Sequence, residues 1–329
     1  MAADGGRKIL ITGAYGFVGL HLVVQLRDMF GSSARLSPTS LTAQTHPEFG
    51  AFEALDVTDE QAVAQAIAQF QPTHVVHLAG LAAVTAASTK VNAALAWRVH
   101  LFGTLNVANA ILAHAPDCVM LSVGSGQVYG GSARTGLLLS ENTVLAPSNG
   151  YEVTKAAADL AVGALTGQGL RSVRLRPFNH TGPGQTEDFV LPSFGMQIAR
   201  IEAGLQAPVV RVGNLDAERD FLDVRDVTRA YGLAIEKAHE LPAGIVLNIA
   251  SGQPRRIRDL LDQMLQLARV PIAVEADPAR MRPSDTPRFV GEAELAQRLL
   301  GWRPAFSMEQ TLGSVLNDCR ERVASANAR

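Results

Sequence analysis

The segment GYEVTKAAADL places Tyr151 and Lys155 four positions apart, in a stretch with a helical pattern. On a helix this spacing brings both side chains to one face. A free tyrosine has a pKa of about 10 and exchanges protons poorly at neutral pH. A neighbouring ammonium and a position near a helix N-terminus both favour the phenolate, so we expect the pKa of Tyr151 to be lowered. Such a tyrosine can move the one proton that accompanies hydride transfer at a carbon–oxygen bond.

A second hydroxyl stands upstream, where the apolar run CVMLSVGS ends in Ser125. We expect Ser125 to hold the substrate oxygen, and Lys155 to reach the ribose of a nicotinamide nucleotide as well as to act on Tyr151. The predicted catalytic residues are therefore Ser125, Tyr151 and Lys155. Gln127 follows two positions after Ser125. Because a glutamine side chain does not ionise, it cannot be the extra acid or base that an elimination reaction needs.

A glycine motif, ILITGAYGFVGLHLVVQL, lies where an apolar strand passes into an amphipathic helix. Glycines at this junction permit a tight turn, close approach of the backbone to a pyrophosphate and close helix–strand packing, and the helix N-terminus attracts phosphate. The spacing is GxxGxxG, and we predict that it binds NAD(H) or NADP(H). The predicted cofactor-binding residues are Gly13, Tyr15, Gly16, Phe17, Val18, Gly19, Asp56, Val57, Leu78, Ala79, Gly80, Tyr151 and Lys155.

The choice between the two nicotinamide cofactors depends on the end of the second strand, SARLSPT. A carboxylate there would bond the ribose 2′-hydroxyl and reject a 2′-phosphate, and this strand has none. No arginine is placed to hold a 2′-phosphate either, so both cofactors stay open. Asp56, in ALDVTD after the presumed third strand, has two interpretations: it bonds the adenine amino group, or it caps the helix that begins near Asp59.

Strand and helix patterns alternate through the first half of the chain. Buried strands are predicted at Lys8–Thr12, His74–Gly80, Cys118–Ser125 and Arg171–Pro177, and helices near 17–28, 59–70, 92–114 and 151–167. This alternation predicts an α/β fold of the Rossmann type, a doubly wound parallel sheet. After Pro177 come a loop FNHTGPGQ, a helix ended by Gly204, strands in VVRVGN, IVLNIAS and VPIAVEAD, and further helices.

We predict two interleaved domains from this order. Residues 1–177 and about 214–250 form the NAD(P)-binding Rossmann domain. Residues about 178–213 and 251–329 form a smaller mixed α/β domain that binds the substrate.

Composition excludes several classes of function. The 329-residue chain has a formal net charge of -2, 47% hydrophobic and 18% charged residues, which gives no reason to expect nucleic acid or an anionic membrane as partner. Its two cysteines lack metal-ligand spacing, so we predict no metal site. The start MAADGG has no leader pattern and no apolar run reaches 18 residues, so we expect a cytoplasmic protein without a membrane span.

Taken together, these motifs resemble an extended short-chain dehydrogenase/reductase of the nucleotide-sugar-modifying kind, over essentially the whole chain. Later landmarks of the resemblance are RPFNHTGPGQ, RDFLDVRDV and LLGWRP. The segments FNH, FVLPSFGMQIARIE and MRPSDTPRFVG are most similar to the branch of GDP-6-deoxy-D-mannose reductases and GDP-mannose 4,6-dehydratases. Two positions depart from the family pattern: His100 stands where asparagine is usual, and Gly80 where alanine is usual.

The resemblance implies which residues bind the substrate. Arg219 and Arg282 match positions of the family's diphosphate-binding arginines, and Asn179 matches a sugar-diphosphate contact. Each has a second interpretation: Arg219 as an ion pair with Asp220 or Asp223, and Asn179 as a turn residue. Gln127, Asn179, Val190, Gln197, Arg219 and Arg282 are the predicted substrate-binding residues.

The resemblance also implies the reaction, which we predict to be reduction of the C4 ketone of GDP-4-dehydro-6-deoxy-D-mannose to GDP-D-rhamnose. One alternative is a nucleotide-sugar 4-epimerase that retains its NAD. Gln127 disfavours another, GDP-mannose 4,6-dehydration, since the family supplies a glutamate there. A nicotinamide sensor without chemistry is the remaining class. The family further implies a homodimer through helices near 92–114 and 151–167.

Overall fold

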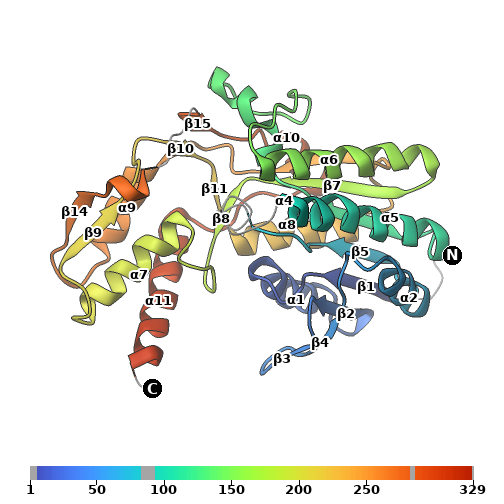
Figure 1. Cartoon of the computed structure of the whole chain (residues 1–329), viewed down its shortest axis with the longest axis horizontal. Helices are drawn as coiled ribbons and strands as arrows, with labels where there is room; N and C mark the ends of the chain where they lie inside the picture. The colour runs from blue at the N-terminus through green and yellow to red at the C-terminus, as the bar shows by residue number, and fades with distance from the viewer. Residues whose placement is uncertain (1–5, 83–92, 282–285, 328–329) are drawn as a thin grey trace.

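The computed structural model describes residues 6–82, 93–281 and 286–327. It contains one large sheet, with strands in the order β12-β7-β6-β5-β1-β2-β4-β3 (Figure 1). All neighbours in this sheet are parallel except β3 and β4. Its strands are β1 (Arg7–Thr12), β2 (Ala34–Ser40), β3 (Gln44–His46), β4 (Gly50–Ala54), β5 (His74–His77), β6 (Val119–Val123), β7 (Arg171–Pro177) and β12 (Ile245–Ile249).

Helices cover both faces of this sheet, because its central strands are apolar on both sides. Ile9 and Ile11 of β1 pack toward one face and Leu10 toward the other, and all three are buried. The first face carries α1 (Phe17–Phe30), α8 (Val224–Glu236) and α10 (Glu294–Leu300). The second carries α2 (Glu60–Phe70), α5 (Gly103–His114) and α6 (Gly150–Leu165). The predicted doubly wound Rossmann sheet is confirmed.

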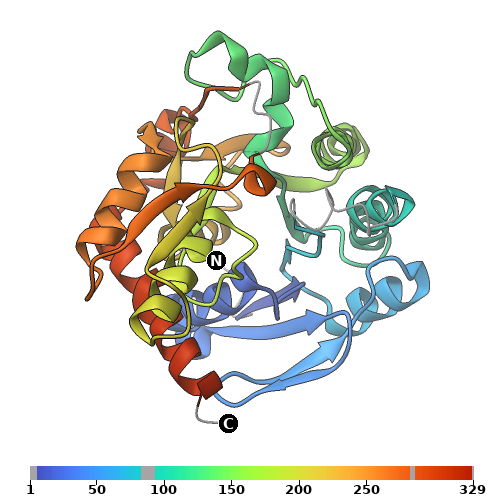
Figure 2. The ribbon, with the colours of Figure 1, turned by 60° about the vertical axis from the view of Figure 1, so that its left-hand side comes forward.

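Helix α5 is the last part of a longer helical segment. It is preceded by α4 (Ala93–Trp97) and by a π-helical turn, η2 (Arg98–Phe102), in which the Gly103 N–H donates to the Arg98 carbonyl. We predicted a single helix near 92–114, because the helix propensities of these residues do not indicate a π-turn. Because π-turns widen a helix by one residue, they often mark functional sites. Figures 1 and 2 show α5 and α6 side by side, which brings this turn next to α6.

A smaller mixed α/β region stands beyond the sheet, on the left of Figure 1. Its buried core is separate from the two cores of the sheet and comes from α7 (Val190–Glu202), β9 (Val209–Val212), α9 (Ile257–Gln266) and α11 (Met308–Asn327). The remaining elements are β8 (Asn179–Thr181), β10 (Glu218–Arg219), β11 (Phe221–Asp223), β13 (Arg255–Arg256), β14 (Ala273–Ala276), β15 (Arg288–Phe289), and the 3-10 turns η1 (Gly31–Ser33), η3 (Gly126–Thr135), η4 (Thr166–Gln168) and η5 (Pro278–Arg280).

Two local predictions differ from the structure. The presumed third strand before ALDVTD is present as β4, which pairs with β2, but it also forms an unpredicted hairpin with β3. The segment FNHTGPGQ was predicted as a loop, but Asn179–Thr181 pairs in parallel with β11 as β8. Both elements are only three to five residues long, so they carry too few residues for a period to be recognised.

Candidate active site

Ser125 lies just beyond the carboxyl end of β6, at the start of η3. Its backbone is extended and its hydroxyl accepts a hydrogen bond from the Gln127 N–H at 3.1 Å. Gly126 next to it is required by packing, because a Cβ there would lie 3.0 Å from the ring of Phe178. These contacts fix the Ser125 hydroxyl at the sheet edge where ligands of open α/β sheets bind.

Tyr151 stands in the first turn of α6, opposite that hydroxyl. Asn149 caps this helix by accepting from the Glu152 N–H at 3.0 Å. The Ser125 hydroxyl and the Tyr151 phenol are hydrogen-bonded, which lowers the pKa of Tyr151, but burial outweighs this and raises it above its ordinary value. Our expectation of a lowered pKa was therefore wrong. A protonated phenol is the form that can donate a proton.

Lys155 follows one helical turn later on the same helix. Its Nζ donates to the Val123 carbonyl at 3.1 Å, so the ammonium is held at the end of β6. Burial lowers the pKa of Lys155 to about 8, while the carboxylate of Asp159 works in the opposite direction. Ser125, Tyr151 and Lys155 thus converge at one place, which we call the catalytic side.

Asp159 was missed by the sequence reasoning, although its spacing of four from Lys155 on a helix is a readable signal. This buried carboxylate forms ion pairs with Arg176 at 2.6 Å and Arg174 at 3.3 Å. Arg176 in turn donates to the Tyr129 hydroxyl, which donates to Asn248 Oδ1 at 2.7 Å. The catalytic side is therefore backed by a continuous buried polar network.

The glycine turn between β1 and α1 has the geometry of a phosphate-binding turn. Gly13 has φ of 69° and a Cβ there would lie 2.8 Å from the backbone of Ala79, while a Cβ at Gly19 would lie 2.4 Å from the Ala14 carbonyl oxygen. Gly16 caps α1 without any side-chain hydrogen bond, and no acidic residue lies in the first turn. The first N–H groups of α1 therefore face no competing anion, which fits a pyrophosphate.

The aromatic residues of this turn are fixed by packing. The ring of Tyr15 meets Phe52 edge-on at 5.1 Å, and the ring of Phe17 stacks on His180 at 6.2 Å. Val18 packs against the sheet core. These contacts hold the turn in place and leave its backbone as the binding surface.

The neighbouring strand ends complete the cofactor side. Leu78 donates its N–H to the Thr12 carbonyl at 3.1 Å, and the Ala79 N–H reaches Thr12 Oγ1 at 3.3 Å. A Cβ on Gly80 would lie 3.5 Å from Lys155 Nζ, so this segment runs beside the catalytic lysine. The segment links the glycine turn to the catalytic side.

Asp56 does not cap a helix, so that interpretation was wrong. Asp59 is the N-cap of α2, where it accepts from the Ala62 N–H at 3.0 Å, and Asp56 Oδ1 accepts from the N–H and hydroxyl of Thr58. Val57 is buried and its carbonyl accepts from Asn106. Asp56 itself is exposed and can still meet an adenine.

Three of the six predicted substrate-binding residues lie beyond the sheet. Asn179 on β8, Val190 at the start of α7 and Arg219 on β10 lie on the short elements beyond the sheet, and we call these three the substrate side. Asp220 accepts a hydrogen bond from Ser251, and Asp223 accepts one from Arg225. The Arg219 guanidinium donates to the Glu218 carbonyl at 2.7 Å.

Gln197 lies on α7 and bonds the neighbouring strand β9. Its amide oxygen accepts from the Arg211 N–H at 2.8 Å and its amide nitrogen donates to the Arg211 carbonyl at 3.2 Å. The buried side chain thus forms two hydrogen bonds with the backbone of β9, as a neighbouring strand would. Gln127 is half-buried next to Ser125, and Arg282 lies outside the described residues.

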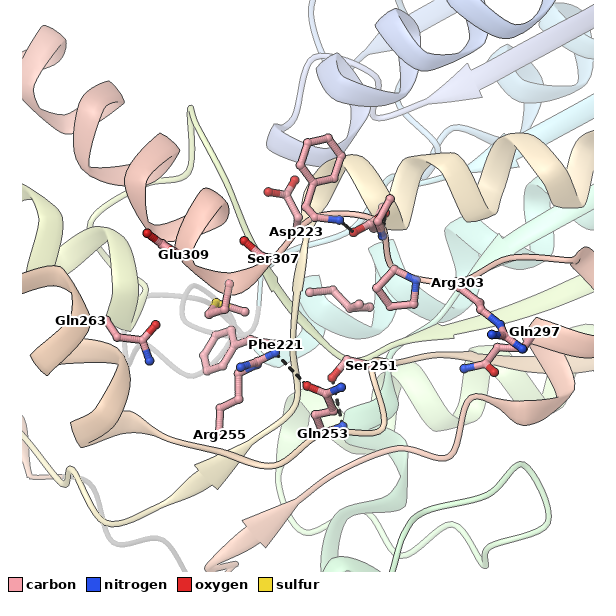
Figure 3. A pocket seen from close by; sticks show the side chains of 16 residues that line it. Phe221, Asp223, Ser251, Gln253, Arg255, Gln263, Gln297, Arg303, Ser307 and Glu309 are labelled. Carbon is pink, nitrogen blue, oxygen red and sulfur yellow. Dashed lines mark hydrogen bonds between the residues drawn. The ribbon is translucent and has the colours of Figure 1, made fainter. Parts of the chain in front are cut away.

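A cavity of about 820 Å³ is lined by none of the predicted site residues but lies next to the substrate side, because its lining residues Phe221 and Arg255 pair with Asn179 and Arg219. Figure 3 shows its walls, which come from β11, the start of α8, α9 and the segment that leads into α11. Arg255 there donates to Gln253 Oε1 at 3.0 Å. Among the described residues, no cluster of three His, Cys, Asp or Glu could hold a metal ion. No described helix is long and apolar enough to cross a membrane.

Comparison with known proteins agrees with this geometry. The profile of the family described as GDP-mannose 4,6 dehydratase matches residues 10–315. The GDP-6-deoxy-D-mannose reductase of Pseudomonas aeruginosa is 35% identical, over 96% of this chain and 98% of that protein. The UDP-glucose 4-epimerase of Rhizobium meliloti is 26% identical, over 94% and 96%.

Solved structures give the same result. The structure of RMD from Pseudomonas aeruginosa complexed with NADPH superimposes with a TM-score of 0.82 at 32% identity, covering 96% of this chain and 99% of that one. The protein therefore belongs to the GDP-mannose 4,6-dehydratase family, within the extended short-chain dehydrogenases/reductases that its motifs predicted.

Proposed function

We propose that the protein reduces the C4 ketone of GDP-4-dehydro-6-deoxy-D-mannose to GDP-D-rhamnose, with NADPH or NADH as reductant. The observation that carries this proposal is the buried phenol of Tyr151, hydrogen-bonded to Ser125 and protonated at neutral pH. Reduction of a ketone requires one proton donor beside one hydride donor, and nothing else. The 35% identity to a GDP-6-deoxy-D-mannose reductase supports the same substrate.

The residues of the chain have separate tasks in this reaction. A bound nicotinamide cofactor supplies the hydride. Ser125 orients the substrate carbonyl by donating a hydrogen bond to its oxygen, and Tyr151 delivers the proton to that oxygen. Lys155 stabilises the phenolate left on Tyr151, because its ammonium stays within the same buried pocket. Asn179, Val190 and Arg219 bind the nucleotide diphosphate, with Arg282 as a further cation.

The side chain next to Ser125 argues against elimination. The dehydratase reaction needs an additional acid–base group, and Gln127 does not ionise. A 4-epimerase needs the same three catalytic residues, and an epimerase is among the relatives at 26% identity. The strand end Pro38–Thr39–Ser40 carries no carboxylate to retain NAD by its ribose, which favours a cofactor that exchanges at each turnover.

An absorbance assay tests the proposal. Purified protein is mixed with the enzymatically prepared 4-keto sugar and either NADPH or NADH, and we expect the reduced-cofactor absorbance to fall while NMR identifies GDP-D-rhamnose as product. No loss of absorbance with either cofactor contradicts the proposal. Conversion of a GDP-hexose to its C4 epimer without added cofactor would instead support the epimerase.

We also propose a homodimer through the helices of the second face. Leu95 on α4, Phe102 on η2 and Leu160 on α6 are 40%, 54% and 57% exposed, which is unusual for large apolar side chains on adjacent helices. Phe102→Glu together with Leu160→Glu is expected to convert the dimer to a 34.9 kDa monomer in light scattering. A wild-type protein of that mass contradicts the dimer.

The division into a Rossmann domain and an interleaved substrate domain remains part of this proposal. The separate core of α7, β9, α9 and α11 supports it, although α10 packs on the sheet core rather than on that one. Two buried, unpaired cysteines, Cys118 and Cys319, are consistent with the reducing cytoplasm as the location.

A further inference from the structure

The imidazole of His100 lies in the π-turn η2, buried between the catalytic helix and the end of β5. It is 1% exposed and meets the ring of Tyr151 edge-on, with ring centroids 5.7 Å apart. Its Nδ1 lies 2.8 Å from Thr154 Oγ1 on α6, and its Nε2 lies 2.9 Å from the Leu81 backbone nitrogen. One side chain thus contacts both the helix that carries Tyr151 and the segment that follows Gly80.

The partners determine which nitrogen carries the proton. The Leu81 N–H is a donor, so Nε2 accepts from it and Nδ1 carries the hydrogen. Nδ1–H then donates to Thr154 Oγ1, whose own hydroxyl hydrogen goes to the Gly150 or Tyr151 carbonyl, at 3.1 and 3.0 Å. The Leu81 carbonyl also lies 3.2 Å from Nε2, but the Leu81 N–H is closer at 2.9 Å, which favours the Nδ1–H form of His100.

Further hydrogen bonds connect this region to the glycine turn through a second buried histidine, His77. Thr104 Oγ1 donates to the His100 carbonyl at 2.6 Å and therefore accepts from His77 Nε2–H at 3.0 Å. His77 Nδ1 then accepts from Thr12 Oγ1 at 2.8 Å, and Thr12 precedes Gly13. One series of hydrogen bonds thus runs from the cofactor turn to the His100 backbone carbonyl, and a second runs from the His100 ring to the first turn of α6.

We propose that His100 is a positioning residue whose Nδ1–H imidazole holds Tyr151, through Thr154, in register with the Gly80–Leu81 segment beside the cofactor. This inference rests on the proposed reductase function. The imidazole does not touch the reacting atoms; it sets the distance between the proton donor and the cofactor wall. Misplacement of a reacting group by about 1 Å costs roughly 100-fold in rate.

The surroundings keep this imidazole uncharged. Burial lowers the pKa of His100 to about 4 and that of His77 to about 3, and the ammonium of Lys155 adds to both effects. The titratable groups that face His100 are Lys155 and Tyr151 from α6 and His77 from β5. A protonated Nε2 could no longer accept from the Leu81 N–H and would turn toward the Leu81 carbonyl, 3.2 Å away.

Two amide substitutions separate the two contacts of the ring. An asparagine amide reaches the position of Nδ1, so His100→Asn keeps the bond to Thr154 and loses the one to Leu81. A glutamine amide reaches the position of Nε2, so His100→Gln keeps the bond to Leu81 and loses the one to Thr154. His100→Phe loses both, and His114→Phe, an exposed histidine at the end of α5, is the control.

Steady-state kinetics with the 4-keto sugar then distinguish the two contacts, because the bond to Thr154 should affect kcat and the bond to Leu81 should affect the KM for NADPH. We expect His100→Phe to lower kcat roughly 100-fold and to raise the NADPH KM roughly tenfold. His100→Asn should restore kcat alone, His100→Gln should restore the cofactor KM alone, and His114→Phe should match the wild type. Equal losses in the asparagine, glutamine and phenylalanine variants, in step with a lowered Tm, would overturn the proposal and leave a packing role.

Two measurements do not depend on turnover. Nitrogen-15 NMR of the full-length protein should show His100 in the Nδ1–H form from pH 5.5 to 8, and NADPH titration by fluorescence should follow the KM pattern above. If the NADPH affinities of the wild type and the His100 variants follow that pattern, yet the wild type does not reduce the 4-keto sugar, the reductase proposal fails and the positioning role stands. An Nε2–H tautomer overturns the positioning role whatever the activity. Should His100→Phe not fold, Thr154→Val replaces it and Thr154→Ser is its rescue.

Discussion

Around Tyr151 the polar side chains bond one another inside the protein, whereas Asn179, Val190 and Arg219 lie half-buried or exposed on short strands and at a helix start. Tyr151, Lys155 and Asp159 each have a partner on another element, namely Ser125, the Val123 carbonyl and Arg176. On the substrate side Val190 is 37% exposed, and no hydrogen bond to another described residue holds the half-buried amide of Asn179.

The difference separates two requirements of the proposed reaction. Proton delivery depends on fixed distances, so the catalytic side is organised before any ligand binds. Recognition of a large, flexible nucleotide sugar can be completed by the ligand itself, because its phosphates and base supply the missing partners. Substitutions on the catalytic side should therefore affect kcat or stability, and those on the substrate side should affect KM.

The largest effect is expected from Tyr151→Phe, which removes the proton donor and keeps the ring. We expect kcat to fall roughly 10³-fold, because general acid catalysis contributes 10²–10⁴-fold, while the affinity for NADPH stays unchanged. Steady-state kinetics and a fluorescence titration measure the two. An active Tyr151→Phe protein would assign the proton to another group, and a wild type that binds cofactor without turnover would point to the sensor.

Asp159→Asn should destabilise the protein by roughly 3–5 kcal/mol, because it leaves the guanidinium of Arg176 buried without its carboxylate. It should also move the alkaline limb of the kcat profile to lower pH, since the carboxylate is what keeps the pKa of Lys155 from falling further. Urea unfolding measures the first effect. Glu187→Gln, in the exposed pair with Arg200 at 2.7 Å, is the control and should cost less than about 1 kcal/mol. Equal losses of stability in Asp159→Asn and Glu187→Gln would mean that burial of an ion pair does not increase the cost of breaking it.

Acid should lower the free energy of unfolding through His100 and His77, the two buried histidines near the catalytic side. In the unfolded chain a histidine takes up a proton near pH 6.5, whereas the folded protein resists this until about pH 4 at His100 and about pH 3 at His77. Stability is thus fully present above pH 6.5 and falls as the pH drops toward those values, by about 2 kcal/mol for each histidine at pH 5. Urea unfolding at pH 7 and pH 5 tests this, and His100→Asn should reduce the difference by about half, because His77 remains. A free energy of unfolding that does not change over this range contradicts it.

The smallest effect is expected from Asn179→Ala on the substrate side. Loss of one hydrogen bond to the ligand should raise the KM for the sugar nucleotide roughly tenfold, with kcat and Tm unchanged. A fall in kcat with KM unchanged would place Asn179 on the catalytic side and remove the contrast between the two regions.

Sequence reasoning reached the sheet, the glycine turn and the convergence of Ser125 with Tyr151, because each depends on a local period or a short spacing. It misjudged the pKa of Tyr151, because burial of a phenol cannot be read from its neighbours in the chain. It missed the hydrogen bonds Thr12–His77, His77–Thr104 and His100–Thr154, whose partners are 65, 27 and 54 positions apart. The pairing of Gln197 with β9 could not be read from the sequence either, because it joins residues 14 positions apart.

The π-turn η2 has one further consequence. Its five residues point His100 into the site and leave Phe102, two positions later, 54% exposed on the face of the proposed dimer. A partner subunit that immobilised Phe102 would narrow the motion of His100, and a cofactor that ordered His100 would do the same for Phe102. Thermodynamic reciprocity then requires that NADPH strengthen subunit association by the same factor by which association strengthens NADPH binding.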